Sequence, residues 1–165
     1  MAQGNGWRAM RRWDLTDVAM VAAKVHPELP ESVEVFAERL RLFAAGCLVL
    51  ERGGCVIGYA ISHPINPNTP PALNAMLGEI PASADQYYIH DIAILPEARG
   101  AGQAREAVEV LLRVAERYRS AALVSVYGTA EFWARFGFTP AAEDMTAKLA
   151  AYGADAVYMV RDQAA

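Results

Sequence analysis

One stretch constrains the fold more than any other: an apolar strand that runs through a glycine-bearing turn into a long helix. Residues 87–94 (YYIHDIAI) are rich in aromatic and β-branched side chains, which favour a strand. Residues 96–102 form a turn with Gly100 and Gly102, and residues 104–119 keep apolar side chains at helical spacing. Backbone N–H groups that converge at the start of a helix bind a phosphate or a diphosphate. The stretch therefore predicts an anion-binding strand–turn–helix unit.

Two other nucleotide-binding loops are excluded by the residues that follow these glycines. A P-loop requires Lys-Ser or Lys-Thr after its last glycine, whereas Gln103-Ala104 follows here. A dinucleotide fingerprint requires a third glycine and an acidic residue about 20 positions further along, at a strand end, and neither is present. From these glycines alone, a tight turn that binds no ligand remains an alternative interpretation.

The rest of the chain alternates strands and helices, which indicates a single α/β domain over residues 1–165. Residues 64–86 carry five prolines between two strands and are expected to form a long loop, such as a lid. Residues 162–165 are expected to be a frayed tail. The remaining predicted elements are strands at 7–12, 47–51, 55–62, 122–126 and 156–160, and helices at 18–25, after Ser32, and at 130–136, the last ended by Gly137.

Composition excludes several classes of protein. Hydrophobic residues make up 54% of the 165, too many for a disordered chain, and a formal net charge of −4 argues against a nucleic-acid binder. No apolar run approaches the roughly 20 residues of a membrane span, and no secretory signal is recognised. We therefore expect a cytoplasmic protein that does not associate with a membrane. Cys47 and Cys55 flank a hairpin turn, where they could face each other, and are expected as buried small hydrophobes rather than a disulfide or metal ligands.

Two motifs at a characteristic separation carry a family resemblance. Arg99-x-x-Gly102-x-Ala104 resembles the Q/R-x-x-G-x-G/A signature of the GCN5-related N-acetyltransferase (GNAT) superfamily. Residues 91–97 (DIAILPE) resemble that family's central strand, and residues 130–138 (AEFWARFGF) resemble its later A-x-x-F-Y-x-x-x-G-F motif. The order of the other elements also matches, so the resemblance covers residues 7–160.

The resemblance implies a single-domain α/β GNAT fold. Its mixed, mostly antiparallel central sheet splays between the fourth and fifth strands, with helices on both faces. Acetyl-CoA would lie in that opening as co-substrate, and the chain would transfer the acetyl group to a primary amine of a small molecule or a peptide, without metal. The residues implied in binding acetyl-CoA are Ile92, Ala93, Ile94, Arg99, Gly100, Ala101, Gly102, Gln103, Ala104, Arg105 and Trp133.

The catalytic residues follow less directly from the motifs. His90 is the candidate general base, because it lies on the central strand where family members carry a glutamate or histidine and an imidazole titrates near neutral pH. Strand alternation puts Asp91 on the opposite face, in a structural role. Trp133 stands where many members have a tyrosine and cannot protonate a thiolate, so Tyr127 is the candidate general acid.

The other two histidines are weaker candidates. His26 is expected as an exposed loop residue between two helices, and His63 is expected near the mouth of the cleft. Trp133 also keeps open an alternative function, a non-catalytic acyl-CoA binding or sensing module. A regulator that acts on RNA-bound substrates is disfavoured by the acidic net charge. The sequence leaves open the acceptor, the acyl length and whether the chain forms a homodimer.

Overall fold

Seven strands form one mixed sheet in the order β1-β2-β3-β4-β5-β7-β6 in a computed structural model, which describes residues 4–163. Only β4 and β5 run parallel, and the other neighbours are antiparallel. The strands are β1 (Gly6–Ala9), β2 (Cys47–Arg52), β3 (Cys55–Ile65), β4 (Gln86–Ile94), β5 (Ser120–Ser125), β6 (Thr139–Pro140) and β7 (Val157–Asp162). The helices are α1 (Leu15–Val25), α2 (Val33–Leu42), α3 (Gln103–Ala115) and α4 (Ala130–Ala134), with short 3-10 turns that include η4 (Ala150–Tyr152).

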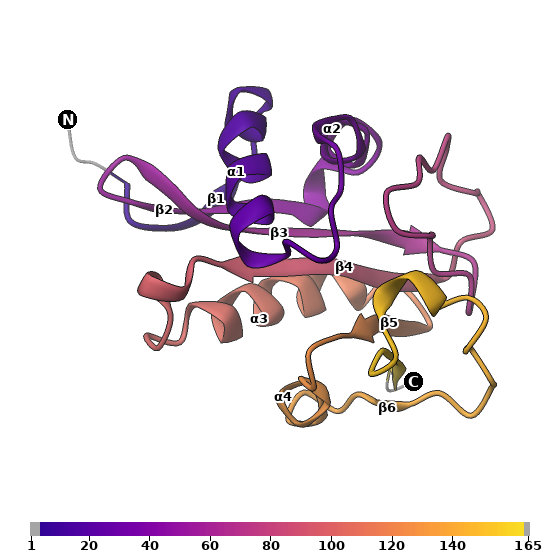
Figure 1. Cartoon of the computed structure of the whole chain (residues 1–165). Helices are drawn as coiled ribbons and strands as arrows, with labels where there is room; N and C mark the ends of the chain where they lie inside the picture. The colour runs from indigo at the N-terminus through magenta and orange to yellow at the C-terminus, as the bar shows by residue number, and fades with distance from the viewer. Residues whose placement is uncertain (1–3, 164–165) are drawn as a thin grey trace.

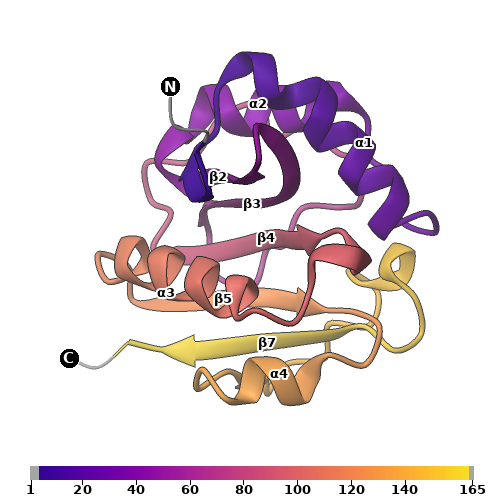
Figure 2. The same ribbon diagram turned by 90° about the vertical axis from the view of Figure 1, so that its left-hand side faces the viewer.

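Helices cover both faces of the sheet, as predicted. Figure 1 shows α1 and α2 on one face and α3 on the other, and Figure 2 shows β7 running beside β5 with α4 beyond it. Each helix buries one apolar stripe because its apolar residues recur three or four apart. On α3 the stripe is Ala107, Val108, Leu111 and Ala115, which packs with Tyr87 and Leu123 of the sheet. The mixed, helix-covered sheet is therefore confirmed.

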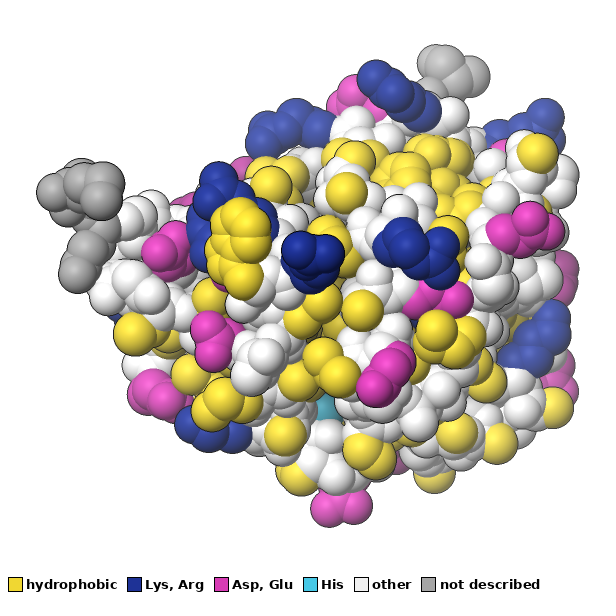
Figure 3. Space-filling view, turned by 90° about the horizontal axis from the view of Figure 1, so that it is seen from above, with side chains coloured by type: hydrophobic (Ala, Val, Ile, Leu, Met, Phe, Trp, Pro, Cys, Tyr) yellow, Lys and Arg dark blue, Asp and Glu magenta, His cyan; other side chains and the backbone are white. Residues whose placement is uncertain are grey.

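The outer faces of α1 and α2 remain open to solvent. In Figure 3, which views these helices from above, basic side chains stand among apolar ones. Met20 of α1 is 55% exposed, whereas Val18 and Val21 on the same helix are buried. The contrast follows from the 3.6-residue period, which turns one stripe of the helix to the core and leaves the rest in water.

The sheet splits between β4 and β5, also as predicted. The two strands pair only from Gln86–Ile89 to Ser120–Leu123, and β4 continues to Ile94 with β3 as its partner. At the point of separation the β3–β4 register passes from Ile61↔Asp91 to Ser62↔Ile89, so His90 has no partner. One extra residue on one strand is a β-bulge, which bends and twists the strand. The bulge therefore coincides with the start of the split.

Several local predictions differ from the structure. The first strand is shorter than residues 7–12, and the helix predicted to Arg119 ends at Ala115. Cys47 is buried and pairs with Ile61, whereas Cys55 is exposed and pairs with Arg52, so the cysteines do not face each other. The prediction of a buried Cys55 was wrong because this strand end protrudes beyond the packed helices.

The tail begins inside the sheet. Asp162 is the last residue of β7, and the N–H group of Gln163 donates to the Arg119 carbonyl oxygen at 3.0 Å. Residues 164–165 of the expected frayed tail lie outside the described residues. Within residues 4–163, every helix falls short of the length and apolar character that a membrane span needs.

The proline-rich segment is tied to α2 by a buried carboxylate. Its first two predicted residues belong to β3, and residues 66–85 contain neither helix nor strand. Glu38 accepts the N–H groups of Leu77 at 2.6 Å and Gly78 at 3.0 Å, and it pairs with the fully buried Arg39. Burial alone would raise the pKa of Glu38, but these donors and the Arg39 charge outweigh it and hold the pKa below its usual value. The ionised carboxylate thus fixes the path of the segment.

Replacing Glu38 with alanine should lower the free energy of unfolding by about 3 kcal/mol, because the fully buried Arg39 loses its carboxylate partner and the N–H groups of Leu77 and Gly78 lose their acceptor. Urea unfolding followed by circular dichroism measures the difference. The stabilisation from the lowered pKa is complete at neutral pH and is lost as the pH falls through the folded-state pKa. Glu34→Ala on the exposed face of the same helix is the control, with a change below about 0.5 kcal/mol. Equal effects of the two variants would contradict this role.

Candidate active site

A cavity of about 170 Å³ lies in the split between β4 and β5. Its walls come from β4, the end of β5, α4, the segment between α1 and α2, and two residues from the long loop and η4. The lining residues are His26, Leu29, Glu31, Leu73, Ile89, His90, Asp91, Ile92, Ala104, Leu123, Val124, Val126, Tyr127, Thr129, Phe132, Trp133 and Tyr152. One part of this wall is apolar and the other carries two histidine–carboxylate pairs.

Trp133 belongs to the apolar part. Its ring meets Phe132 and Phe138 edge to face, at centroid distances of 5.0 and 5.8 Å, and the residue is 9% exposed. Such packing holds the indole in one orientation. Trp133 therefore presents a fixed apolar surface to the cavity, together with Ile92 and Ala104.

The predicted anion-binding turn lies at the start of α3. Gly102 is the N-cap with φ 80°, and Gly100 has φ 99°. A Cβ at either position would meet nothing within 4 Å, so the positive φ and not crowding requires glycine. The first helical hydrogen bond runs from the Glu106 N–H to the Gly102 carbonyl, which leaves the N–H groups of residues 103–105 as open donors. Positive partial charge at this helix start favours an anion.

Arg99 links the turn to the end of β4. Its Nε donates to the Ile94 carbonyl oxygen at 2.9 Å, while the side chain lies in an exposed part of the chain. Beyond Ile89, β4 has no strand partner on the side of the split. The predicted acyl-CoA residues 92–94 and 99–105 therefore form one continuous edge, from the cavity to the helix start.

His90 and Glu31 form the first pair in the polar part. His90 Nε2 lies 2.6 Å from Glu31 Oε1, and the two side chains are only 2% and 7% exposed. His90 Nδ1 is buried and has no hydrogen-bond partner among residues 4–163. Burial would raise the pKa of Glu31, but His90 and the Asn74 N–H group outweigh it and lower the pKa. His90 is thus on the cavity wall, held by a carboxylate from the segment between α1 and α2.

His26 and Asp91 form the second pair. His26 Nε2 lies 2.9 Å from Asp91 Oδ1, and the Tyr59 hydroxyl donates to Asp91 Oδ2. The expectation of an exposed His26 was wrong, since its side chain is 13% exposed. Burial would lower the pKa of His26, but Asp91 and then Glu31 outweigh it and raise the pKa. Burial would likewise raise the pKa of Asp91, which His26 and Tyr59 bring below its usual value.

Asp91 does not lie on the opposite face from His90, because both residues line the same cavity. Simple alternation fails here because the bulge at His90 interrupts the two-residue period of β4. The neighbouring residues of β4 thereby hold both histidine–carboxylate pairs, and both pairs connect β4 to the chain between α1 and α2.

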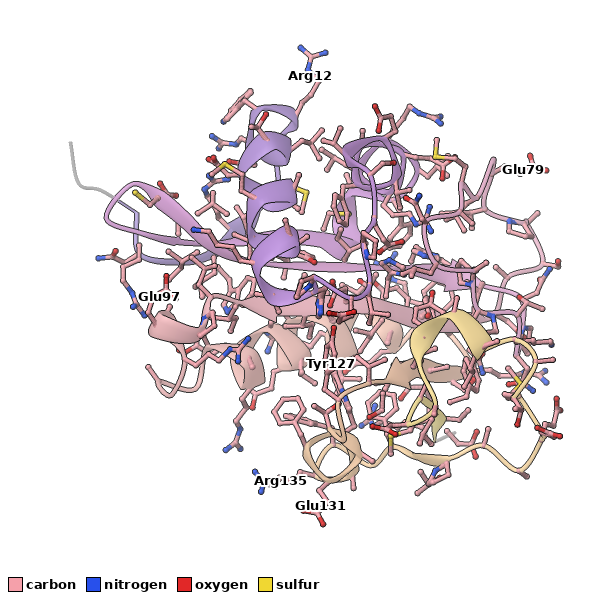
Figure 4. The ribbon with its side chains drawn as sticks, viewed as in Figure 1. Arg12, Glu79, Glu97, Tyr127, Glu131 and Arg135 are labelled. Atoms are coloured by element: carbon pink, nitrogen blue, oxygen red, sulfur yellow. The ribbon has the colours of Figure 1, made fainter. Side chains whose placement is uncertain are left out.

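Tyr127 closes the polar part from the side of β5. Its ring stacks on His26 with centroids 5.7 Å apart and planes 10° apart, and Oη lies 3.3 Å from His26 Nδ1. The residue is 54% exposed and has φ 56°, a conformation that non-glycine residues adopt at a cost. Figure 4 shows it between the lower end of α1 and α4. Burial and the charges of Asp91 and Glu28 raise the pKa of its hydroxyl.

His63 is not at the mouth of the cavity. It is fully buried on β3, with Nδ1 3.1 Å from the Pro64 carbonyl oxygen. Burial above all, with a smaller contribution from His90, lowers its pKa to about 3, so it stays neutral. From the sequence, Glu31 is not indicated as a site residue, Asp91 is expected in a structural role, and His26 ranks below His90. Their common signal is a polar cluster around the helix-breaking His26-Pro27 step, opposite a His-Asp pair on the strongest strand.

Comparisons with solved structures identify the same architecture in other proteins. The loading GNATL domain of CurA from Lyngbya majuscula superposes with a TM-score of 0.75 at 15% identity, over 95% of this chain and 96% of that one. Ard1 from Thermoplasma volcanium gives 0.72 at 15% identity, over 96% and 97%. Arabidopsis thaliana Naa50, in complex with the bisubstrate analogue CoA-Ac-MVNAL, gives 0.71 at 11% identity, over 95% and 97%. At these identities the likeness shows the fold.

The sequence itself was also compared with known families. No curated protein matches it significantly. The family described as the acetyltransferase (GNAT) family matches residues 7–138, which contain the split strands, the glycine turn and α4. The chain therefore belongs to the acetyltransferase (GNAT) family.

Proposed function

We propose that the protein transfers an acetyl group from acetyl-CoA to a primary amine. The observation that carries the proposal is the split itself, an open edge of β4 that runs from the two histidine–carboxylate pairs to the start of α3. Membership of the family supports it, as does the fold shared with Naa50, whose structure holds a CoA-containing analogue.

The residues along this edge suit an acyl-CoA. The open N–H donors of residues 103–105 and the guanidinium of Arg99 would hold the diphosphate. The backbone of residues 92–94 would pair with the amide groups of the pantetheine arm as an added strand would. Trp133 would supply an apolar wall. Bound acetyl-CoA supplies an activated thioester, and the chain must orient the amine, remove its proton and stabilise the negative charge on oxygen.

Individual residues can stabilise the charge on oxygen and move the protons. The N–H group of Ile94 would donate to the carbonyl oxygen as charge develops there. Our sequence-based proposals for the two proton transfers are His90 as general base and Tyr127 as general acid. Both side chains line the cavity, and a second histidine, His26, lines it beside them. The raised pKa of Tyr127 means that its hydroxyl is protonated at neutral pH but is a weaker acid than a free phenol.

A small free amine fits the cavity better than a peptide. The long loop and the segment around η4 are joined by two hydrogen bonds, Tyr152 Oη to the Pro71 carbonyl at 2.8 Å and Lys148 Nζ to the Asn68 carbonyl at 2.7 Å. Leu73 and Tyr152, from these same segments, line the cavity. The joined segments would obstruct an extended chain there. We therefore propose a small amine as the acceptor.

Reversing the charge of Arg99 tests where the diphosphate binds. Arg99→Glu should raise the Kd of coenzyme A about tenfold, which corresponds to about 1.4 kcal/mol, because a cation beside the anion is replaced by an anion. Isothermal titration calorimetry measures the Kd of coenzyme A for the wild type and for the variant. Arg113→Glu, an exposed position in the last turn of the same helix, is the matched control and should leave the Kd within twofold. If the two variants weaken binding equally, the diphosphate does not lie at this turn.

The size of the acceptor can be tested by measuring release of free thiol from acetyl-CoA. Small primary amines should be acetylated, whereas pentapeptides with free amino termini should react at least tenfold more slowly. Tyr152→Ala, which removes both the hydrogen bond to Pro71 and a ring that lines the cavity, should narrow this difference, whereas Tyr152→Phe, which removes only the hydrogen bond, should keep most of it. Faster reaction with peptides would refute the small-amine proposal. Coenzyme A binding without thiol release from any amine would favour the non-catalytic binding module.

A further inference from the structure

We propose that His26, oriented by Asp91, accepts the proton of the attacking amine, and that the Tyr127 hydroxyl passes this proton to it. The inference rests on the proposed acetyl transfer and names the proton path at that site. It differs from the assignment of the base to His90. Three observations carry it: an unbroken hydrogen-bonded chain, the accessibility of its outer end, and the charges around it.

The chain of contacts runs from the surface to the core. Tyr127 Oη lies 3.3 Å from His26 Nδ1, His26 Nε2 lies 2.9 Å from Asp91 Oδ1, and Asp91 Oδ2 accepts the Tyr59 hydroxyl. Since an ionised carboxylate only accepts, the neutral His26 ring carries its hydrogen on Nε2. Its lone pair is therefore on Nδ1, the atom that faces Tyr127. Asp91 thus acts as a positioning residue that sets the tautomer.

The outer end of this chain is open to an acceptor. Tyr127 is 54% exposed and lines the cavity, as does His26. The strained backbone of Tyr127, with φ 56°, is followed by Gly128 with φ 70° in a turn where Thr129 Oγ1 donates to the Val126 carbonyl at 2.8 Å. This turn holds the phenol ring nearly parallel to the imidazole, with the ring centroids 5.7 Å apart. Strained residues held by their surroundings are common at functional sites.

His90 is less suited to exchange a proton with an acceptor. Its side chain is 2% exposed, and Nε2 is engaged by Glu31 at 2.6 Å. Its other nitrogen is buried without a hydrogen-bond partner among residues 4–163, and the ring centroids of His63 and Tyr88 lie 6.3 and 6.0 Å from that of His90. Neither nitrogen of His90 is thus both unengaged and exposed to an amine in the cavity. The His90–Glu31 pair instead holds the segment that carries His26.

The charges facing His26 support a proton on its ring. Asp91 and His90 face it from β4, Glu31 from its own segment, Tyr59 from β3, Tyr127 from the turn after β5, and Arg99 from the turn before α3. Asp91 and Glu31 favour the imidazolium, and Arg99 opposes it. The carboxylates prevail over burial, so the pKa of His26 is raised. A raised pKa makes neutral His26 a stronger base.

Acetyl transfer moves one proton from the amine nitrogen through Tyr127 to His26. The amine nitrogen forms a bond to the carbonyl carbon, the carbon–sulfur bond breaks, and the sulfur leaves with the electron pair. The nitrogen gives a proton to Tyr127 Oη while the Oη hydrogen moves to His26 Nδ1, so that tyrosine stays neutral and His26 becomes an imidazolium. That cation then returns one proton to the thiolate or to water, which restores the starting state.

The test is the pH dependence of kcat/KM for the best amine of the thiol-release panel. Wild-type activity should rise with pH through the raised pKa of His26, because only the neutral ring accepts a proton. His26→Asn should lower kcat/KM about a hundredfold and remove this acid limb. Asp91→Asn should move the limb to lower pH. His90→Gln is the matched comparison, and it should keep the limb at its wild-type position even if the rate falls.

Two further measurements keep the outcome interpretable if a variant folds poorly. Coenzyme A binding, which does not require His26, reports an intact fold in each variant. The pKa of His26, measured by NMR in the protein without ligand, should lie above 6.5 in the wild type and should be lower in Asp91→Asn. This measurement does not depend on activity. An acid limb that persists in His26→Asn, or that disappears in His90→Gln, overturns this proposal and leaves acetyl transfer intact. A wild-type protein that binds coenzyme A and releases no thiol overturns both.

Discussion

The separation of β4 from β5 is the constraint on which the rest of the structure depends. A parallel pair that stayed joined beyond Ile89 and Leu123 would satisfy its own backbone groups and leave no edge for a ligand. The bulge at His90 bends β4 at the point where the pairing ends. The same separation makes room for the cavity and leads it toward the open N–H groups of α3. The open edge of β4 and the polar wall of the cavity therefore meet at one irregularity in one strand.

The polar part of the site is assembled across long distances in the sequence. Glu31 and His90 are 59 residues apart, and His26 and Asp91 are 65 apart, yet both pairs connect the same short segment to the same two positions of β4. The side chains of both pairs are largely buried in the cavity wall. A buried carboxylate is tolerated there because it has a cationic or hydrogen-bonding partner. These contacts hold the segment between α1 and α2 over the split. The ion pairs thus fix the segment that carries His26 and Glu31 beside the cavity.

Much of the architecture could be predicted because it rests on local patterns. The strand–turn–helix unit follows from β-branched and aromatic residues, two glycines and a 3.6-residue period, and two motifs then indicate the family. The pairing of His26 with Asp91 could not be predicted. A single bulged residue reverses the alternation after it, and nothing local to residues 87–94 signals that bulge. Likewise, the path of residues 66–85 depends on Glu38, whose burial results from tertiary contacts that no local pattern signals.

Hydrogen–deuterium exchange with and without coenzyme A tests the central claim, that this open edge is where the cofactor binds. The ligand should slow exchange in peptides covering residues 90–105, because the free N–H groups of β4 and of the start of α3 gain acceptors. Peptides from α2 (Val33–Leu42), none of whose residues lines the cavity, should exchange at unchanged rates. Slowed exchange confined to other parts of the chain, with residues 90–105 unaffected, would contradict the claim that the split between β4 and β5 is the acyl-CoA site.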